Sequence, residues 1–225
     1  MSFDIEINKN HIEEIEKIVS LYMNIYSTQI VSEKLQEIIS KNSEINKPHT
    51  FYWWLRQNYV YSIILQITKL LDSDRRSISL CNLLHNLIKD RYLSENQYLM
   101  TWKVNDPKPI LKDEHIKMEF KQIVNRNGAC CPIDMLITDV QELDKKFDKI
   151  RKYRNKILAH NDLKPEKYTD VTFNDIEESI SFLGEMIKKY ALLLKAKVVL
   201  LDNIIDFSMV DFEDIFKTEW IKDPL

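Results

Sequence analysis

Glycine is almost absent from this chain, with only Gly128 and Gly184 among 225 residues. Because the tight turns of hairpins draw heavily on glycine, so small a supply disfavours a sheet of many strands. It also excludes the glycine-rich loops that cradle phosphates, G-x-G-x-x-G and G-x-x-x-x-G-K-[ST]. The sequence therefore predicts an all-α protein, a bundle of about five to seven helices.

Apolar residues recur at spacings of three and four along most of the chain, which is typical of amphipathic helices. The predicted helices span residues 10–40, 50–71, 78–91, 116–124, 136–157 and 174–201, with a short last helix starting at Ser208. The aromatic run beginning at Phe51 indicates that the second helix is largely buried. Residues 92–113 contain two prolines and show no sustained period, so we expect a long surface connection there.

Capping patterns mark where two of these helices should begin. Asn10 with Glu13, and Asn174 with Glu177, have the three-residue spacing of a capping pair. We therefore expect the first helix to start near Asn10 and the last long helix near Asn174.

The length of the chain suits one domain over residues 1–225, with an N-terminal helical extension (1–45), a bundle core (50–206) and a short C-terminal helix (207–225). No apolar run approaches the ~18 residues of a membrane span, and the first residues lack the basic and apolar regions of a leader. Three cysteines are too few for a disulfide framework and fit a reducing compartment. We expect a cytoplasmic protein without membrane contact.

Several kinds of site lack their residue patterns in this sequence. None of the five histidines has a glutamate three residues before it, as di-iron bundles require. There is no C-x-x-C, no H-E-x-x-H and no G-x-S-x-G, and the carboxylates are scattered. We therefore expect neither a metal nor a cofactor. His85 is interpreted as a histidine of the core.

Residues 145–156 form a basic segment, with seven Lys or Arg against one Asp, on a chain whose formal net charge is −3. Such a segment is either an ordinary solvated helix face or a surface that binds phosphates. In the second case the phosphate-binding candidates are Lys149, Arg151, Lys152 and Lys156.

Arg154 continues an apolar stripe, since the preceding positions 136, 140, 143, 147 and 150 are all apolar. Burying an unpaired guanidinium costs several kcal/mol. Arg154 is therefore expected either to form an intramolecular salt bridge, to extend to solvent near the helix end, or to line a cleft between subunits.

The segment Arg154-Asn155-x-x-x-x-His160 resembles the Arg-(polar)-x-x-x-x-His motif of the HEPN superfamily. The longer match, Arg-Asn-Lys-x-x-Ala-His-x-Asp at 154–162, with Lys-Leu-Leu-Asp at 69–72 and Ser-Ile at 77–78, is similar to the abortive-infection AbiU-like HEPN proteins. The similarity runs from about residue 52 to 190. It implies a HEPN-type bundle and a metal-independent endoribonuclease that acts as a toxin or abortive-infection effector.

The residue types of the motif suit RNA cleavage by the substrate's own 2′-hydroxyl. His160 has the side chain that moves protons near neutral pH, and the guanidinium of Arg154 stabilises charge on phosphate oxygens. Asn155 could hold a phosphate oxygen or orient His160, and Asp162 could fix the histidine tautomer. HEPN toxins controlled by a nucleotidyltransferase antitoxin resemble each other in a tyrosine where this chain has Asp162, so that form of control is not expected.

On an ideal helix, Arg154 and His160 are ~9 Å apart along the axis and ~120° apart around it, which suits one scissile phosphate poorly. Two motifs paired across a two-fold axis could form one cleft, and the resemblance implies the same homodimer. The expected partners are RNA, either tRNA or mRNA, a second copy, and an antitoxin or regulatory protein. Two alternatives remain: a non-catalytic HEPN protein that binds a nucleotide or RNA or acts as a scaffold, and a helical interaction module without a site.

Overall fold

The computed structural model describes residues 2–43, 46–47, 50–105, 111–125, 128–129, 131–159 and 171–197. Within these ranges the chain forms seven α-helices and one π-helical segment, and no strand. They are α1 (Ser2–Lys41), α2 (Thr50–Leu70), α3 (Leu80–Asp90), α4 (Glu95–Asn105), α5 (Asp113–Val124), α6 (Pro132–Tyr153), the π-helix η2 (Arg154–Ala159) and α7 (Phe173–Lys195). The predicted all-α fold is confirmed.

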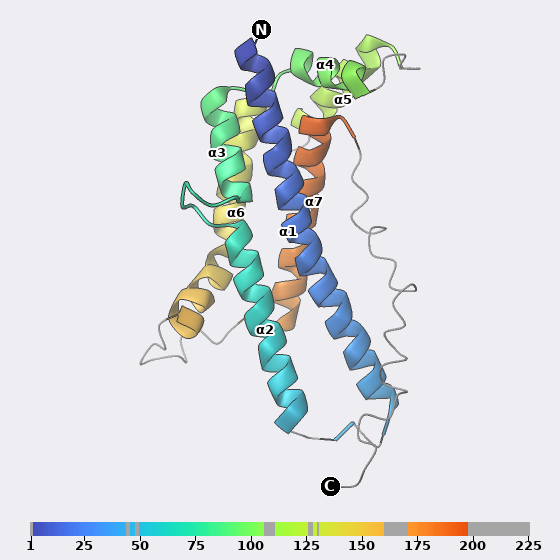
Figure 1. Ribbon diagram of the computed structural model, residues 1–225, viewed down its shortest axis with the longest axis vertical. Helices are drawn as coiled ribbons and strands as arrows, with labels where there is room; N and C mark the ends of the chain where they lie inside the picture. Colours follow the sequence, from blue (N-terminus) through green and yellow to red (C-terminus); the bar gives the residue numbers. More distant parts are fainter. Residues whose placement is uncertain are drawn as a thin grey trace.

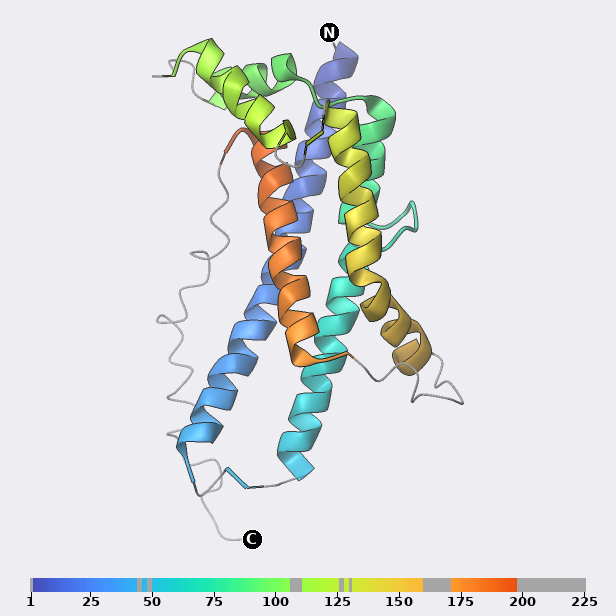
Figure 2. The same cartoon turned by 180° about the vertical axis from the view of Figure 1, so that it is seen from behind.

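The long helices form an elongated antiparallel bundle (Figure 1). α1 and α6 run in one direction, while α2, α3 and α7 run in the other, and α3 continues the path of α2 after a loop. The α4–α5 pair lies across the end of the bundle that holds the N-terminus, as the view from behind also shows (Figure 2). No described helix is both long and apolar enough to cross a bilayer.

α1 is an integral helix of the bundle rather than an extension. Ile15, Ile18 and Ile25 have no exposed surface, and α1 packs along α7 and α2. The helix starts at Ser2, so the predicted start at Asn10 is wrong. No glycine or proline interrupts residues 2–41, and the apparent capping pair therefore lies inside the helix.

α2 is buried in its second half only. Its buried residues are Ile63, Ile64, Ile67 and Leu70, whereas Phe51, Trp53 and Trp54 are 49%, 60% and 52% exposed. The prediction of a largely buried helix is wrong for the first half. The physical reason is the position of α7, which begins part of the way along α2, so that the first turns of α2 do not pack against α7 (Figure 2).

The segment after α2 is a loop, as predicted, and is closed by hydrogen bonds from polar side chains. The amide nitrogen of Asn82 donates to the carbonyl oxygens of Asp74 (2.6 Å) and Ser77 (2.8 Å). The hydroxyl of Ser79 caps α3 by accepting from the Asn82 N–H. This loop fixes the end of α2 against the start of α3.

α4 replaces the surface connection expected at residues 92–113. Tyr98 and Leu99 are buried, and the Tyr98 hydroxyl donates to Glu119 of α5 at 3.0 Å. Its sequence shows little amphipathic pattern. The helix packs against α5 on one side and α7 on another, so its buried residues do not share a single face. One signal was present: Ser94 and Gln97 have the spacing of a capping box, and the Gln97 N–H does bond to the Ser94 hydroxyl.

α7 begins and ends at other residues than predicted. Its capping box is Thr172 with Asp175, not Asn174 with Glu177. The helix ends at Lys195, because Ala196 adopts the left-handed conformation with φ 48°. The predicted continuous helix to residue 201 is therefore wrong at Ala196. The helix predicted from Ser208 lies outside the described residues.

Candidate functional site

α6 carries the basic segment and ends at the predicted motif. Pro132 occupies its first turn, where a missing N–H has no cost, and the apolar residues Leu136, Leu143, Phe147 and Ile150 form its buried face. This face packs against α3 and α2. Packing of the apolar stripe thus places the C-terminal end of α6 beside the C-terminal end of α2.

At Arg154 the α-helix changes into the π-helix η2, which continues to Ala159. The N–H of Arg154 is shared between the carbonyl oxygens of Ile150 and Arg151. Because a π-helix closes its hydrogen bonds one residue later than an α-helix, the residues that follow leave the register of the apolar stripe. Short π-helical segments of this kind are common at functional sites.

Arg154, at the junction of α6 and η2, is exposed and does not continue the buried face. Its Nη1 donates to Oδ1 of Asn155 at 2.7 Å, and Arg154 takes part in no ion pair within the described residues. Of the three expectations for this residue, extension to solvent near the helix end agrees with the structure. The guanidinium and the neighbouring amide are held together on the surface.

Arg151 is half-buried and joins three elements. Its Nη1 lies 2.6 Å from Oδ1 of Asp144, and its Nη2 donates to the Leu71 carbonyl at 3.4 Å and approaches the Cys81 sulfur at 3.6 Å. Burial raises the pKa of the Cys81 thiol, and the charge of Arg151 partly offsets this effect. Arg151 therefore ties α6 to the end of α2 and the start of α3.

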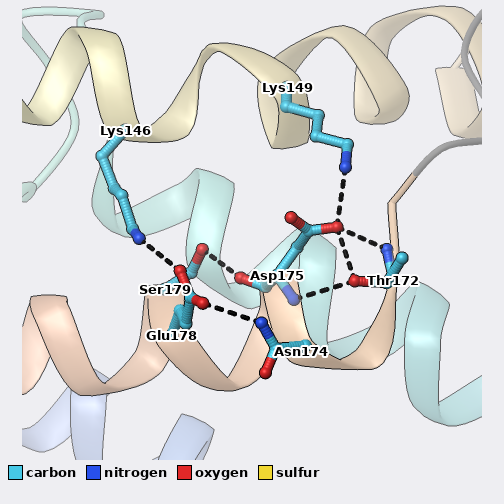
Figure 3. Close-up of polar contacts among 7 residues, drawn as sticks. All are labelled: Lys146, Lys149, Thr172, Asn174, Asp175, Glu178 and Ser179. Atoms are coloured by element: carbon cyan, nitrogen blue, oxygen red, sulfur yellow. Dashed lines mark hydrogen bonds and ion pairs between the residues drawn. The ribbon is translucent and has the colours of Figure 1, made fainter.

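Two further lysines of the basic segment bind α7. Figure 3 shows Lys146 and Lys149 reaching from α6 to the carboxylates of Glu178 and Asp175, each at 2.7 Å. Partial burial disfavours the charged form of Asp175, but hydrogen bonds from Lys149 and from Thr172 outweigh it and lower the pKa of Asp175 to about 2. The start of α7 is thereby fixed to α6.

Much of the positive charge in the basic segment is therefore neutralised within the protein. Besides Lys146, Lys149 and Arg151, the ammonium of Lys152 lies 2.5 Å from the Asp148 carboxylate one turn earlier. Lys156 is exposed in η2, next to Arg154 and Asn155. Of the predicted site residues, the structure thus brings Arg154, Asn155 and Lys156 together on one short exposed segment.

His160 and Asp162 lie outside the described residues. The ~120° offset between Arg154 and His160 assumed an α-helix, whereas five of the residues after Arg154 are π-helical. His85, expected in the core, is exposed, and its Nδ1 lies 2.7 Å from the Cys81 carbonyl oxygen. No group of three metal-ligating side chains occurs among the described residues.

Asp72, the last residue of the Lys-Leu-Leu-Asp segment, was given no role by the sequence. Its carboxylate accepts from the Asp74 N–H at 3.0 Å and the Ser77 hydroxyl at 2.7 Å. These bonds, aided by the nearby positive charge of Arg154, lower the pKa of Asp72. Asp72, in the loop after α2, thus favours its ionised form and interacts through its charge with the Arg154 guanidinium.

A buried polar cluster inside the bundle also escaped the sequence analysis. Asp139 is fully buried on α6 and accepts from Lys189 and from the Tyr190 hydroxyl, both on α7. Burial, reinforced by the Asp139 charge, raises the pKa of Tyr190 well above its ordinary value. The only signal was an aspartate one residue before Val140 of the apolar stripe.

An antiparallel helical bundle, with an exposed arginine and polar pair where its α6 helix ends, defines an all-α protein of the HEPN class. Within that class the chain belongs to the AbiU2 family, whose model matches residues 9–215. The match extends the resemblance noted for residues 52–190 toward both ends of the chain. No curated protein and no solved structure matches the chain.

Proposed function

We propose that this abortive-infection-related HEPN protein is a metal-independent endoribonuclease that acts as a toxin or phage-defence effector. The observation that carries the proposal is the state of Arg154: exposed, outside every ion pair of the described residues, and held by Asn155. An arginine that served only to stabilise the fold would be expected to bind a carboxylate or carbonyl, as Arg151 does.

The proposed reaction needs one proton-transfer group and one fixed positive charge. The substrate's 2′-oxygen attacks the adjacent phosphorus and loses its proton to His160. The bond from phosphorus to the 5′-oxygen breaks as protonated His160 gives a proton to that oxygen. The products are a 2′,3′-cyclic phosphate and a 5′-hydroxyl. Arg154 stabilises the charge on the phosphate oxygens, Asn155 holds Arg154 in place, and Asp162 orients His160.

RNA binding is proposed for the same face of the molecule. Arg154 and Lys156 are exposed on η2 and meet the phosphates first. Lys149 and Lys152 would have to leave their carboxylate partners to contact phosphates. Arg151 has a positioning role, because it hydrogen-bonds the Leu71 carbonyl at the end of α2. Binding should therefore weaken with salt, with a slope that falls by about 1 for each phosphate contact removed.

The test is cleavage of tRNA and of total RNA by purified protein in excess chelator, beside a DNA strand of the same sequence. Arg154→Ala and His160→Ala should each abolish cleavage. Arg91→Ala and His85→Ala are the matched controls, because both residues are exposed and lie outside the motif. Cleavage of DNA, or a requirement for magnesium, would contradict the proposal.

A second candidate is supported by the ion pairs of the basic segment. Lys146, Lys149, Arg151 and Lys152 already bind carboxylates, as structural residues do. A non-catalytic HEPN protein would bind RNA or a nucleotide, or act as a scaffold, without cleaving. Intact RNA that shifts in a gel with the wild-type protein, and less with Arg154→Ala, would favour this function.

A further inference from the structure

The halves of α1 and α2 that lie beyond the start of α7 enclose an open groove. Figures 1 and 2 show the two helices diverging in this region, and the groove between them has a volume of about 540 Å³. Val31, Leu35 and Ile39 line it from α1, Leu55 and Tyr59 from α2, and Phe173 closes the end nearest α7. The lining is mostly apolar, with Trp53 exposed beside it.

An apolar groove of this size on a solvent-exposed surface commonly indicates a binding site. In the other half of the bundle, α7 fills the corresponding place against α1 and α2. The groove is therefore open to one further helix with an apolar face. Binding of an amphipathic helix in an apolar groove is a common mode of peptide recognition.

Arg56 adds a second requirement for the occupant. It lines the groove, and its guanidinium carbon lies 4.4 Å from the centre of the Phe173 ring. No ion pair within the described residues involves Arg56, although it stands over an apolar lining. The groove thus suits a segment that combines large apolar side chains with carboxylates.

We propose that residues 208–221 of this chain occupy the groove. Within them Phe212, Ile215, Phe216 and Trp220 recur at spacings of three and four, which places them on one face if the segment is helical. Asp211, Glu213, Asp214 and Glu219 against a single Lys217 give the segment a net charge of −3, the sign that Arg56 requires. The family match reaches residue 215 and so includes part of this segment.

The length of the chain after α7 permits the contact. α7 has 23 residues and is ~33 Å long, so its end at Lys195 lies about that far from Phe173 beside the groove. Residues 198–207, if extended, span up to ~33 Å. A helix over 208–221 would be ~20 Å long, close to the ~18 Å of α1 from Thr28 to Ser40 that lines the groove.

Hydrogen exchange on the full-length chain tests the proposal. Phe216→Asp removes an anchor, and amides in residues 28–39 and 52–59 should then exchange about tenfold faster than in the wild type. Thr218→Asp adds the same charge on the opposite face and should leave exchange unchanged. On the groove side, Leu35→Asp should reproduce the effect, whereas Leu65→Asp, at an exposed leucine of α2 outside the groove, should not.

A labelled peptide of residues 208–221 provides a second readout that does not depend on how well the groove variants fold. It should bind the Phe216→Asp protein, whose groove is vacated, and bind the wild-type protein much more weakly. A peptide carrying Phe216→Asp should bind neither. Equal binding to both proteins would mean that the native groove is empty, and groove protection that disappears on dilution would assign the groove to a second copy. Either result overturns the proposal.

Discussion

Arg151 and Arg154 are three residues apart on one helix, yet their environments are opposite. Arg151 is half-buried with three partners, whereas Arg154 is exposed and, within the part of the chain that the structure describes, hydrogen-bonds through its side chain to its neighbour Asn155 alone. Arg151→Ala leaves the Leu71 carbonyl and Asp144 without their partner and should lower the free energy of unfolding by about 1–2 kcal/mol. Arg154→Ala should change it by less than about 0.5 kcal/mol.

Urea unfolding followed by circular dichroism measures both changes. The difference between the two variants separates a role in folding from a role in function. If Arg154→Ala were the more destabilising variant, the loss of any activity in it could not be assigned to the site.

Asp139 should be the most sensitive polar residue of the bundle. Removing its carboxylate in Asp139→Ala leaves Lys189 and Tyr190 unpaired in the interior, which should cost about 3 kcal/mol of unfolding free energy. Glu142→Ala, an exposed acidic position three residues later on α6, is the control and should cost little. Equal midpoints of urea unfolding in the two variants would contradict the structural role of Asp139.

At the scale of elements, Gly184 allows α7 to approach α1. A Cβ on Gly184 would overlap the hydroxyl of Tyr22, which donates a hydrogen bond to the Ile180 carbonyl oxygen at 3.2 Å. Gly184→Ala should therefore destabilise the bundle by about 1–3 kcal/mol, because the two helices must separate. Adding Tyr22→Phe, which removes the overlapping oxygen, should recover part of the loss in thermal unfolding, whereas Glu185→Ala should have little effect.

The start of α7 should contribute stability that depends on pH. The folded-state pKa of Asp175 is about 2, against 3.8 for the unfolded chain, so its contribution is present above about pH 4 and lost as the pH falls toward 2. Asp175→Asn should therefore be less stable than wild type by about 1 kcal/mol at pH 6, since the partial exposure of the carboxylate reduces the effect.

The difference in unfolding free energy between wild type and Asp175→Asn, measured by urea unfolding at each pH, should become smaller between pH 4 and pH 3. Glu177→Gln, at an exposed position of the same helix, is the control and should follow the wild-type curve. A gap that stays constant across this range would show that the charge of Asp175 does not stabilise the cap.

The sequence predicted those helices whose buried residues follow a regular apolar period within the helix itself. α3 and α6 bury most of the residues that the period indicates, and the loop after Leu71 has the expected polar side chains. α4 was missed because its burial comes from contacts with α5 and α7. The exposed aromatic half of α2 could not be foreseen, since it depends on where α7 begins.

The site was predictable in identity rather than in geometry. The motif located Arg154 and Asn155, but an apolar period alone cannot show that the helix changes from α to π at Arg154 or that Arg154 is exposed. The period also could not show that Lys149, Arg151 and Lys152 form ion pairs. Their partners are Asp175 of α7 and two aspartates of α6, Asp144 and Asp148. Ion pairs depend on tertiary contacts, which a local charge count does not contain.

For the molecule as a whole, the proposed ribonuclease should act as a homodimer. A pair of η2 segments facing each other would supply two Arg154 side chains and two copies of His160 to one cleft. Light scattering over a dilution series should give twice the monomer mass, and cleavage per chain should fall where the dimer dissociates. A monomer that cleaves RNA with undiminished activity would exclude the composite cleft.

The π-helix also has a consequence for insertions and deletions. A helix that closes its bonds one residue late contains, in effect, one residue more than an α-helical turn needs. Loss of a single codon between Arg154 and Ala159 could therefore be absorbed by a return to α-helical bonding, with the bundle intact. The chain beyond would then leave the helix in a new direction and carry His160 with it. Deletions of this kind should yield stable protein without activity, whereas the same deletion within residues 136–150 should prevent folding.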